Sequence, residues 1–274
     1  MDRFDRQRLL FGDDGQKRIV GATVGVAGAG GLGAFVALEL AYLGVGCVII
    51  VDADRLERTN RNREVGAWHS HEDGTPKVEV LRDLIALVDP DIEVITVNAT
   101  LQSEEGRMAL SKADVVMGCV DRDGARLLLN EFCCEHGISL IDAASDTASR
   151  ESRVVFGGRV CVCTESTGCL MCFEVLDQDE VREDLGTLGQ RADREDLYGL
   201  PKSALGARGP SVVSVNGVVA SLAVCELMVL LTGLRKPIPH QDWHGHAAVL
   251  RKVIDRGEGC YYCGLRPSSR AARA

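Results

Sequence analysis

The residues best suited to chemistry begin with a glycine-rich loop, Gly28-Ala29-Gly30-Gly31-Leu32-Gly33. The loop lies between a β-prone run, 23–27, and a helical pattern, which is the context that phosphate binding requires. Glycines let the backbone approach a phosphate, and a helix N-terminus supplies N–H groups and the positive end of a dipole. Asp52 ends the next apolar run, where a carboxylate can bind ribose hydroxyls. The pattern predicts a nucleotide site. A structural glycine turn is the alternative, and the loop alone does not separate a dinucleotide from ATP.

Positively charged residues and further carboxylates follow in an order that favours ATP. The segment 54–63 begins with Asp54 and is rich in arginine, Lys77 begins the next expected helix, and Asp121 ends a later apolar run. Cations beside a glycine loop can neutralise several phosphates, and a carboxylate at the carboxyl end of a strand can hold Mg²⁺ on a triphosphate. Taken singly, the arginines could form a solvated helix face and Asp121 could cap a helix. Their joint order along one scaffold predicts phosphate and magnesium contacts instead.

Two Cys-x-x-Cys pairs form a third group, Cys169-Leu170-Met171-Cys172 and Cys260-Tyr261-Tyr262-Cys263. Two such pairs in a reducing compartment are typical of a closed, tetrahedral zinc site with a structural role. Their separation is longer than in compact zinc ribbons, so two unrelated redox or core pairs are the alternative. The chain has 11 cysteines, and this odd number argues against a disulfide framework.

The elements that must position these residues alternate between strands and helices. Expected strands cover 23–27, 47–52, 92–97, 114–121 and 139–142. Expected helices follow residue 33 and cover 77–88, 104–112 and 123–135. This alternation predicts an α/β fold with a Rossmann-like, doubly wound and mostly parallel sheet. Past residue 150 the pattern changes. We expect an antiparallel pair of strands around Gly157-Gly158, a long apolar helix over 210–231 and a last strand over 247–254.

We expect one domain over residues 1–266. Its nucleotide-binding half is expected to span about 1–150, and a partner-binding and zinc-binding half about 151–266. The segment 177–208 is polar and weakly patterned, which is typical of a functional loop, and it is expected to cross over a bound partner. Residues 267–274 are expected to be a disordered tail.

Composition and charge exclude several classes of protein. The 274 residues are 46% hydrophobic and 26% charged, as in ordinary globular chains. The apolar stretch 212–231 contains Ser214, Asn216 and Glu226, so a buried helix is expected rather than a membrane span. The charged N-terminus lacks the apolar core of a signal peptide, so a cytoplasmic protein is expected. A formal charge of −9 opposes nucleic-acid binding.

With these motifs in this order, the chain resembles the E1-like adenylating enzymes of the ThiF, MoeB and HesA type, which activate sulfur carriers in thiamin and molybdopterin synthesis. The resemblance runs from about Arg3 to Cys263. It is carried by Arg3-Phe4-Asp5-Arg6-Gln7, the glycine loop, Asp52-x-Asp54, Thr59-Asn60-Arg61-Asn62-Arg63, Pro76-Lys77, Cys119-Val120-Asp121, both cysteine pairs and the helix after Pro210. It implies ATP-dependent adenylation of the C-terminal carboxylate of a small ubiquitin-like protein ending in Gly-Gly, with release of pyrophosphate.

The resemblance also implies roles for individual residues. Asp52 would bind the ribose, and Asn60 and Arg63 would contact phosphates or the reacting centre. Lys77 would lie on the phosphates, and Asp121 would bind Mg²⁺. Arg6 would reach across a homodimer as an arginine finger. The implied cofactors are ATP, magnesium and a zinc ion held by Cys169, Cys172, Cys260 and Cys263.

The sequence departs from the family's usual motif at two positions. Arg61 stands where an apolar residue is common, and Glu64 stands where glutamine is common. Glu64 brings a negative charge near the phosphates, and it could pair with Arg61 or Arg63.

Other functions remain open at the level of sequence. The same glycine loop would suit a nicotinamide- or flavin-dependent oxidoreductase, and relatives could adenylate a small molecule or an RNA base. An inactive scaffold that only binds a partner is a further alternative. No cysteine occurs between Phe173 and Val224, and Cys225 is expected in the core. Adenylation without a thioester or persulfide is therefore the simplest interpretation, with Cys161 or Cys163 as the remaining candidates for such a step.

Overall fold

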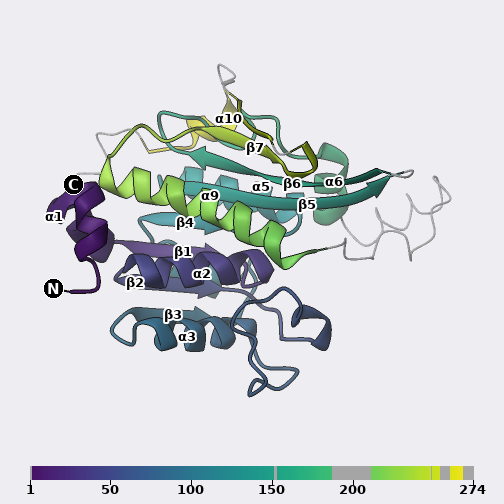
Figure 1. Cartoon of the computed structure of the whole chain (residues 1–274). Helices are drawn as coiled ribbons and strands as arrows, with labels where there is room; N and C mark the ends of the chain where they lie inside the picture. The colour runs from purple at the N-terminus through teal and green to yellow at the C-terminus, as the bar shows by residue number, and fades with distance from the viewer. Residues whose placement is uncertain (1, 151–152, 187–210, 248, 254–259, 268–274) are drawn as a thin grey trace.

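The computed structural model describes residues 2–150, 153–186, 211–247, 249–253 and 260–267. Within them, one sheet has the strand order β3-β2-β1-β4-β5-β6-β7-β8 (Figure 1). The strands are β1 Thr23–Ala27, β2 Cys47–Val51, β3 Glu93–Val97, β4 Val115–Gly118, β5 Ser139–Arg150, β6 Arg153–Cys163, β7 His240–His244 and β8 Val249–Val253. The neighbouring strands β3, β2, β1, β4 and β5 pair in parallel. Strands β6, β7 and β8 then extend the sheet by antiparallel pairing. The expected fold class is confirmed.

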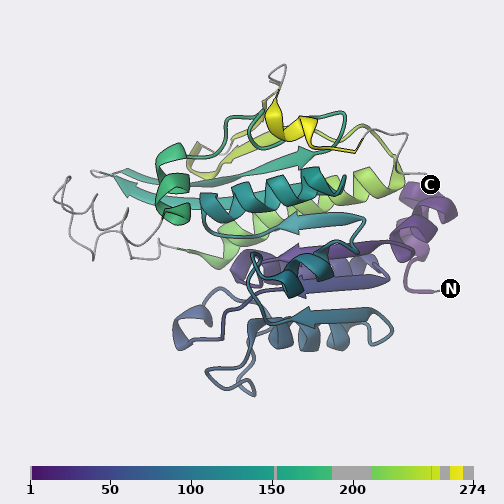
Figure 2. The same ribbon diagram turned by 180° about the vertical axis from the view of Figure 1, so that it is seen from behind.

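Helices cover both faces of the sheet. The helices of the described residues are α1 Asp5–Val20, α2 Gly31–Leu43, α3 Lys77–Val88, α4 Glu104–Leu110, α5 Asp123–Glu135, α6 Gln178–Leu185, α9 Val213–Thr232 and α10 Tyr261–Gly264. Helices α2, α3 and α9 lie on the face seen in Figure 1, and α4 and α5 lie on the face seen in Figure 2. Short 3₁₀ turns form at Arg58–Asn60 and Gly245–Ala247.

Alternating side chains of the parallel strands explain why both faces are covered. Val48 and Ile50 of β2 belong to the core cluster under α2, α3 and α9, whereas Ile49 and Val51 belong to the cluster under α4 and α5. Successive side chains of a strand point to opposite faces, so a strand that is apolar throughout needs a helix layer on each side. This rule explains why β1, β2 and β4 were predictable from their apolar runs, whereas β5 extends to Arg150, beyond the expected strand 139–142.

The expected turn at Gly157-Gly158 is wrong. Strand β6 runs straight through both glycines, which pair with Asp146 and Ser145 of β5. A side chain at Gly157 would overlap the backbone of Trp243 in β7, and one at Gly158 would overlap Val219 of α9. The two glycines therefore mark close approaches inside the sheet rather than a turn.

Helix α9 is long and apolar enough to cross a membrane by length and composition alone. Half of its apolar window is buried, and it packs against α2, β5 and β6. It serves here as a core helix, as the sequence predicted. The crossover segment expected over 177–208 is described only as far as residue 186, and the expected tail over 267–274 lies outside the described residues except for Pro267.

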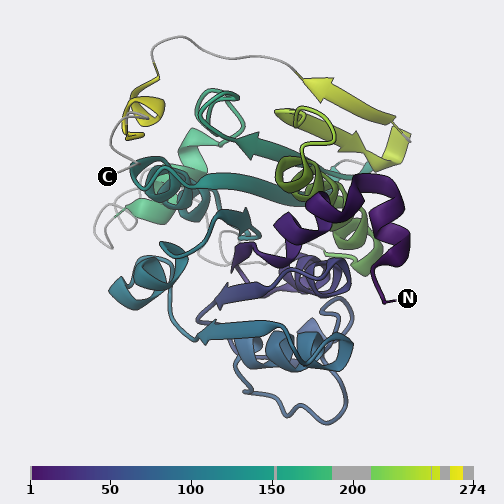
Figure 3. The ribbon, with the colours of Figure 1, turned by 90° about the vertical axis from the view of Figure 1, so that its left-hand side faces the viewer.

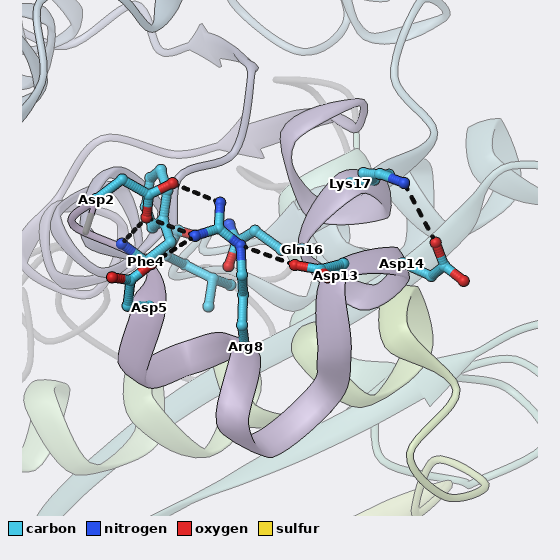
Figure 4. Close-up of polar contacts among 9 residues, drawn as sticks. Asp2, Phe4, Asp5, Arg8, Asp13, Asp14, Gln16 and Lys17 are labelled. Carbon is cyan, nitrogen blue, oxygen red and sulfur yellow. Dashed lines mark hydrogen bonds and ion pairs between the residues drawn. The ribbon is translucent and has the colours of Figure 1, made fainter.

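Helix α1 lies at the end of the sheet opposite the carboxyl ends of the parallel strands, the end that faces the viewer in Figure 3. Phe4, just before α1, packs directly on Gly44 at the C-terminal end of α2. The helix is kinked at Gly12, whose φ is 70°. Arg8 lies within reach of Asp2, Asp5 and Asp13, so it ties the two arms of the kinked helix together (Figure 4).

Candidate nucleotide site and cysteine cluster

The glycine loop lies where β1, β2 and β4 end. The N–H of Gly28 donates to the Val51 carbonyl at 3.0 Å, and the N–H of Cys119 donates to the Ala27 carbonyl at 2.8 Å. Gly28 has a φ of 101°, and a Cβ there would lie 2.6 Å from the Cys119 oxygen. A side chain at Gly33 would overlap the Gly28 carbonyl. Both positions thus require glycine, and the loop folds tightly into the start of α2.

The outer side of this loop is open. A Cβ at Gly30 would meet no described atom within 4 Å, although this residue immediately precedes α2. The first N–H groups of α2 have no partners within the helix, and the open space at Gly30 lies directly beside them in the chain. A helix N-terminus that opens beside a glycine loop can accept phosphate oxygens.

Asp52 is fixed against the loop by its own carboxylate. One oxygen accepts the Ala29 N–H at 2.5 Å, and the other accepts the Asp54 N–H at 2.7 Å. Burial raises the pKa of Asp52 above its ordinary value, and these two backbone hydrogen bonds offset only part of the increase. The next carboxylate along, Asp54, accepts a hydrogen bond from the Lys77 ammonium at 2.9 Å. Because Lys77 begins α3 and is buried, these contacts hold its positive charge beside the glycine loop.

The segment after Asp54 brings Asn60 and Arg63 toward the same place. Asn60 is buried, and its side-chain oxygen accepts the Glu57 N–H at 2.9 Å, which closes a capping box around the 3₁₀ turn. The guanidinium of Arg63 donates to the Thr59 carbonyl at 2.7 Å. A Cβ at Gly31 would lie 3.0 Å from the Arg63 carbonyl, so this segment touches the start of α2.

Arg61 has a structural role in this segment. It pairs with Asp73 at 2.9 Å and donates to the carbonyls of Trp68 and His71 at 3.0 and 2.6 Å. These contacts close the connection between β2 and α3. The departure from an apolar residue at position 61 is therefore explained by loop closure within this chain.

Asp121 is exposed just beyond β4, at the same edge of the sheet. The strand end beneath it is held by Arg126 of α5, which pairs with the fully buried Asp142 at 2.7 Å and donates to the carbonyls of Val120 and Ala143. Burial lowers the pKa of Arg126, but the neighbouring carboxylates of Asp142 and Asp123 raise it by more. The pKa therefore lies above its ordinary value, and the guanidinium stays charged. Asp123 is the first residue of α5 and pairs with Arg126 at 3.4 Å.

Sequence reasoning missed two polar residues at this site. Asn216 of α9 is 3% exposed, and a Cβ at Gly31 would lie 2.5 Å from its side-chain nitrogen. Its side-chain oxygen accepts the Ser145 hydroxyl of β5 at 2.8 Å. A lone asparagine within an apolar helical pattern was the available signal.

The structure thus gathers the glycine loop, Asp52, Asp54, Asn60, Arg63, Lys77 and Asp121 at the carboxyl ends of the parallel strands. Arg6 is not among them. It is exposed on α1, at the other end of α2. Within one chain, Arg6 therefore lies apart from this site.

The two cysteine pairs come together, as expected. The sulfur atoms of Cys169 and Cys172 lie 3.8 Å apart, those of Cys169 and Cys260 lie 3.5 Å apart, and those of Cys172 and Cys263 lie 3.5 Å apart. A tetrahedral zinc site with Zn–S bonds of about 2.3 Å has sulfur–sulfur edges of about 3.8 Å. All four sulfur atoms lie within 4.8 Å of one another, so the donor set fits such an ion.

Arg266 follows the second cysteine pair, and its guanidinium lies near other thiols of the same core. Two nitrogen atoms of its guanidinium are buried and have no hydrogen-bond partner among the described residues. Its positive charge acts on the neighbouring thiols of Cys133, Cys134 and Cys163. Cys225, in contrast, is exposed on α9, so the expectation that it lies in the core is wrong.

Comparison with known proteins identifies the family of this chain. The family model described as "ThiF family" matches residues 4–265. The chain therefore belongs to the ThiF family of E1-like adenylyltransferases, which confirms the resemblance drawn from the sequence.

Similar proteins cover nearly the whole chain. The sulfur carrier protein ThiS adenylyltransferase of Escherichia coli is 29% identical over 268 residues, which are 96% of this chain and 94% of that protein. The molybdopterin-synthase adenylyltransferase of Escherichia coli is 28% identical over 96% of each chain. Protein HesA of Leptolyngbya boryana is 27% identical over 96% of this chain and 86% of its own. The crystal structure of E. coli MccB with ATP shares the fold, with a TM-score of 0.73 at 20% identity over 96% of this chain and 75% of that one.

Proposed function

We propose that this chain binds ATP and Mg²⁺ and adenylates the C-terminal carboxylate of a small ubiquitin-like or sulfur-carrier protein, with release of pyrophosphate. The observation that carries this proposal is the meeting of an open glycine loop, two ordered carboxylates and the buried cation Lys77 at one edge of the sheet. Relatives named for adenylating the sulfur carrier ThiS and for serving molybdopterin synthase support this choice of substrate.

Each part of the nucleotide is proposed to contact different residues of the site. Backbone N–H groups at the start of α2 would bind phosphate oxygens, and Asp52 would accept hydrogen bonds from the ribose. Lys77 and Arg63 would lie along the phosphates, with Asn60 fixing the turn that carries Arg63. Asp121 would hold Mg²⁺, which neutralises phosphate charge when bound.

The reaction needs positioning and positive charge more than proton transfer. A carboxylate oxygen of the carrier attacks the α-phosphorus of ATP, a new P–O bond forms, and the bond to the β-phosphate oxygen breaks as pyrophosphate leaves. Two anions must approach, and negative charge builds up on the leaving group. Fixed cations and dipoles therefore account for most of the acceleration in such a step. Hydride transfer, the main alternative reaction, does not bring two anions together. It therefore gives no reason for positive charges from both Lys77 and Arg63 at this edge of the sheet.

We further propose a homodimer that works in the cytoplasm. The 11 cysteines form no disulfide with one another, which suits a reducing compartment. A dimer is proposed because Arg6 and the site lie at opposite ends of α2 within one chain.

The first test measures nucleotide choice and dependence on a carrier. By calorimetry the protein is expected to bind ATP with Mg²⁺ at least about tenfold more tightly than NAD, because the site holds cations suited to a triphosphate. Exchange of pyrophosphate into ATP is expected only with a sulfur carrier that ends in a free Gly-Gly carboxylate, and the same carrier with an amidated C-terminus is the control. Tight NAD binding without ATP binding would overturn the proposal.

The cysteine cluster makes a separate prediction. About one zinc per chain is expected by elemental analysis of freshly purified protein. Cys263→Ser should lose the ion and lower the unfolding temperature, because zinc joins α10 to the segment after β6 and its binding free energy adds to folding. Cys225→Ser is the matched control, since its thiol is exposed and outside the cluster. A wild-type protein without zinc, or a Cys263→Ser protein that keeps it, would contradict this assignment.

A further inference from the structure

Glu64 is a buried carboxyl group at the nucleotide site that the proposed reaction does not use. Its residue is only 4% exposed. One of its carboxyl oxygens is buried without a hydrogen-bond partner among the described residues. The backbone around it is fixed, because its N–H donates to the Asn60 carbonyl at 3.0 Å and its carbonyl accepts the Ala67 N–H at 3.3 Å. An unsatisfied buried polar atom at a ligand site needs an explanation.

Charged groups from several described segments act on this carboxyl. Lys77 comes from α3, Arg63 precedes Glu64 in its own segment, and Asp52 and Asp54 follow β2. The two cations are engaged elsewhere, since Lys77 pairs with Asp54 and Arg63 donates to a backbone carbonyl. In the described part of the chain, Glu64 forms no ion pair with Arg61 or Arg63, although the sequence allowed one.

These surroundings disfavour the ionised form of Glu64. Burial raises the pKa of Glu64 to about 7, with Asp52 and Asp54 adding to the increase and with Lys77 and Arg63 opposing it. The carboxyl of Glu64 therefore changes its charge near neutral pH, at the site where the triphosphate is proposed to bind.

We propose that nucleotide binding is coupled to protonation of Glu64: the site takes up ATP with this carboxyl uncharged, and its ionised form weakens binding. This inference rests on the proposed function. A triphosphate brings several negative charges to the same edge of the sheet, and like charges at short range oppose ionisation. The protonated carboxyl also gains an O–H that can donate to a phosphate oxygen, whereas a carboxylate can only accept.

The sign of the pH dependence follows from linkage. Below about pH 7 the free protein already holds the proton, so binding takes up none and ATP affinity does not change with pH through Glu64. Above that pH the free protein has lost the proton, and binding must take it up again. The association constant is then expected to fall by up to about tenfold per pH unit, until the pH reaches the raised pKa of Glu64 in the complex.

The experiment is calorimetric titration of the whole chain with ATP and Mg²⁺ at about pH 6 and about pH 8.5, in buffers of different ionisation enthalpy, which gives the number of protons taken up. The wild type should lose at least about tenfold in affinity at the higher pH and take up close to one proton more than Glu64→Gln. The Glu64→Gln protein should bind more tightly than the wild type at about pH 8.5. Comparison with the variant cancels titration of ATP itself and of Asp52.

Two further variants make the test specific. Glu72→Gln removes the same charge from an exposed position in the same connection and should keep the wild-type slope. Glu64→Met, uncharged and of similar length, should lose the pH-dependent slope as Glu64→Gln does. Equal slopes in the wild type and Glu64→Gln would overturn the coupling alone, and so would affinity that rises with pH, which would mean that the ionised carboxylate binds the ligand. Absence of ATP binding at both pH values would overturn the proposed function together with the coupling.

Discussion

Asp121→Asn is expected to lower ATP–pyrophosphate exchange about a thousandfold, or roughly 4 kcal/mol of transition-state stabilisation. Asp121 is the exposed carboxylate at the end of β4, beside the glycine loop. An amide of the same shape lacks the negative charge that holds Mg²⁺ on the phosphates. The measurement is carrier-dependent exchange across a range of magnesium concentrations, and more magnesium should restore part of the lost rate.

The same substitution should leave the fold intact. In the described part of the chain, the side chain of Asp121 forms no hydrogen bond or ion pair, so its loss removes no folding contact; surface changes of this kind usually alter stability by less than about 0.5 kcal/mol. Asp91→Asn is the matched control, because Asp91 is exposed just before β3, at the opposite end of the sheet. Unchanged exchange in Asp121→Asn, or an equal loss in Asp91→Asn, would show that Asp121 does not bind the metal.

The parallel half of the fold was predictable because burial on both faces leaves a simple trace in the sequence. The apolar run at 47–52 became β2 Cys47–Val51, and the expected strand 23–27 became β1 with the same bounds. Pro76 and the pattern behind it placed the start of α3 correctly at Lys77. Local sequence was sufficient in these places, since each strand is apolar enough to require helices on both sides.

The antiparallel half depends on contacts that lie far apart in the sequence. Strand β7, His240–His244, is almost entirely polar and was not predicted, because its strand character comes from pairing with β6 and β8. Gly157 and Gly158 suggested a turn, but they lie within β6 because Trp243 and Val219 leave no room for side chains there. Tertiary context overrides local propensity most easily in strands of this kind.

In the candidate site, too, some residues were predictable from local sequence and others depend on tertiary contacts. Residues that directly follow strands, such as Asp52 and Asp121, were predictable because the carboxyl ends of parallel strands share one edge. Asn216 was missed because its place beside Gly31 depends on how α9 packs across the sheet. The buried pair of Arg126 and Asp142, which holds the end of β4, was also missed. Sixteen positions separate its two residues, so local spacing gave no signal.

The last prediction concerns Arg6, which is expected to complete the site of a second chain. Helix α2 has 13 residues and starts at the glycine loop, so its far end lies about 20 Å away at 1.5 Å per residue. Phe4 packs at that far end, on Gly44. In the described part of the chain, the side chain of Arg6 forms no hydrogen bond or ion pair, whereas Arg8 is held by three carboxylates (Figure 4). Leu9, beside it, is 88% exposed.

An exposed cation next to exposed apolar residues suits a contact between subunits. Large exposed apolar side chains gather at interaction sites, and Leu10 and Val20 of α1 are exposed as well as Leu9. A guanidinium stays charged when it is desolvated and binds phosphate through two hydrogen bonds. An arginine supplied by a partner chain accelerates phosphoryl transfer by several powers of ten in other enzymes. Because Lys77 and Arg63 would also stabilise the phosphate charge here, the effect should be smaller, and we expect Arg6→Ala to lower exchange by about a hundredfold.

Mixing two inactive variants tests whether the residue acts between chains. In a dimer of one Arg6→Ala chain with one Asp121→Asn chain, one site keeps both Asp121 and the partner's intact arginine, and the other site loses both. Random pairing makes half of the dimers mixed, so an equal mixture should regain about a quarter of wild-type activity. Lys17→Ala, an exposed cation on the same helix, should be fully active alone. A mixture that regains nothing, or a fully active monomer in sedimentation, would show that each site is built within one chain.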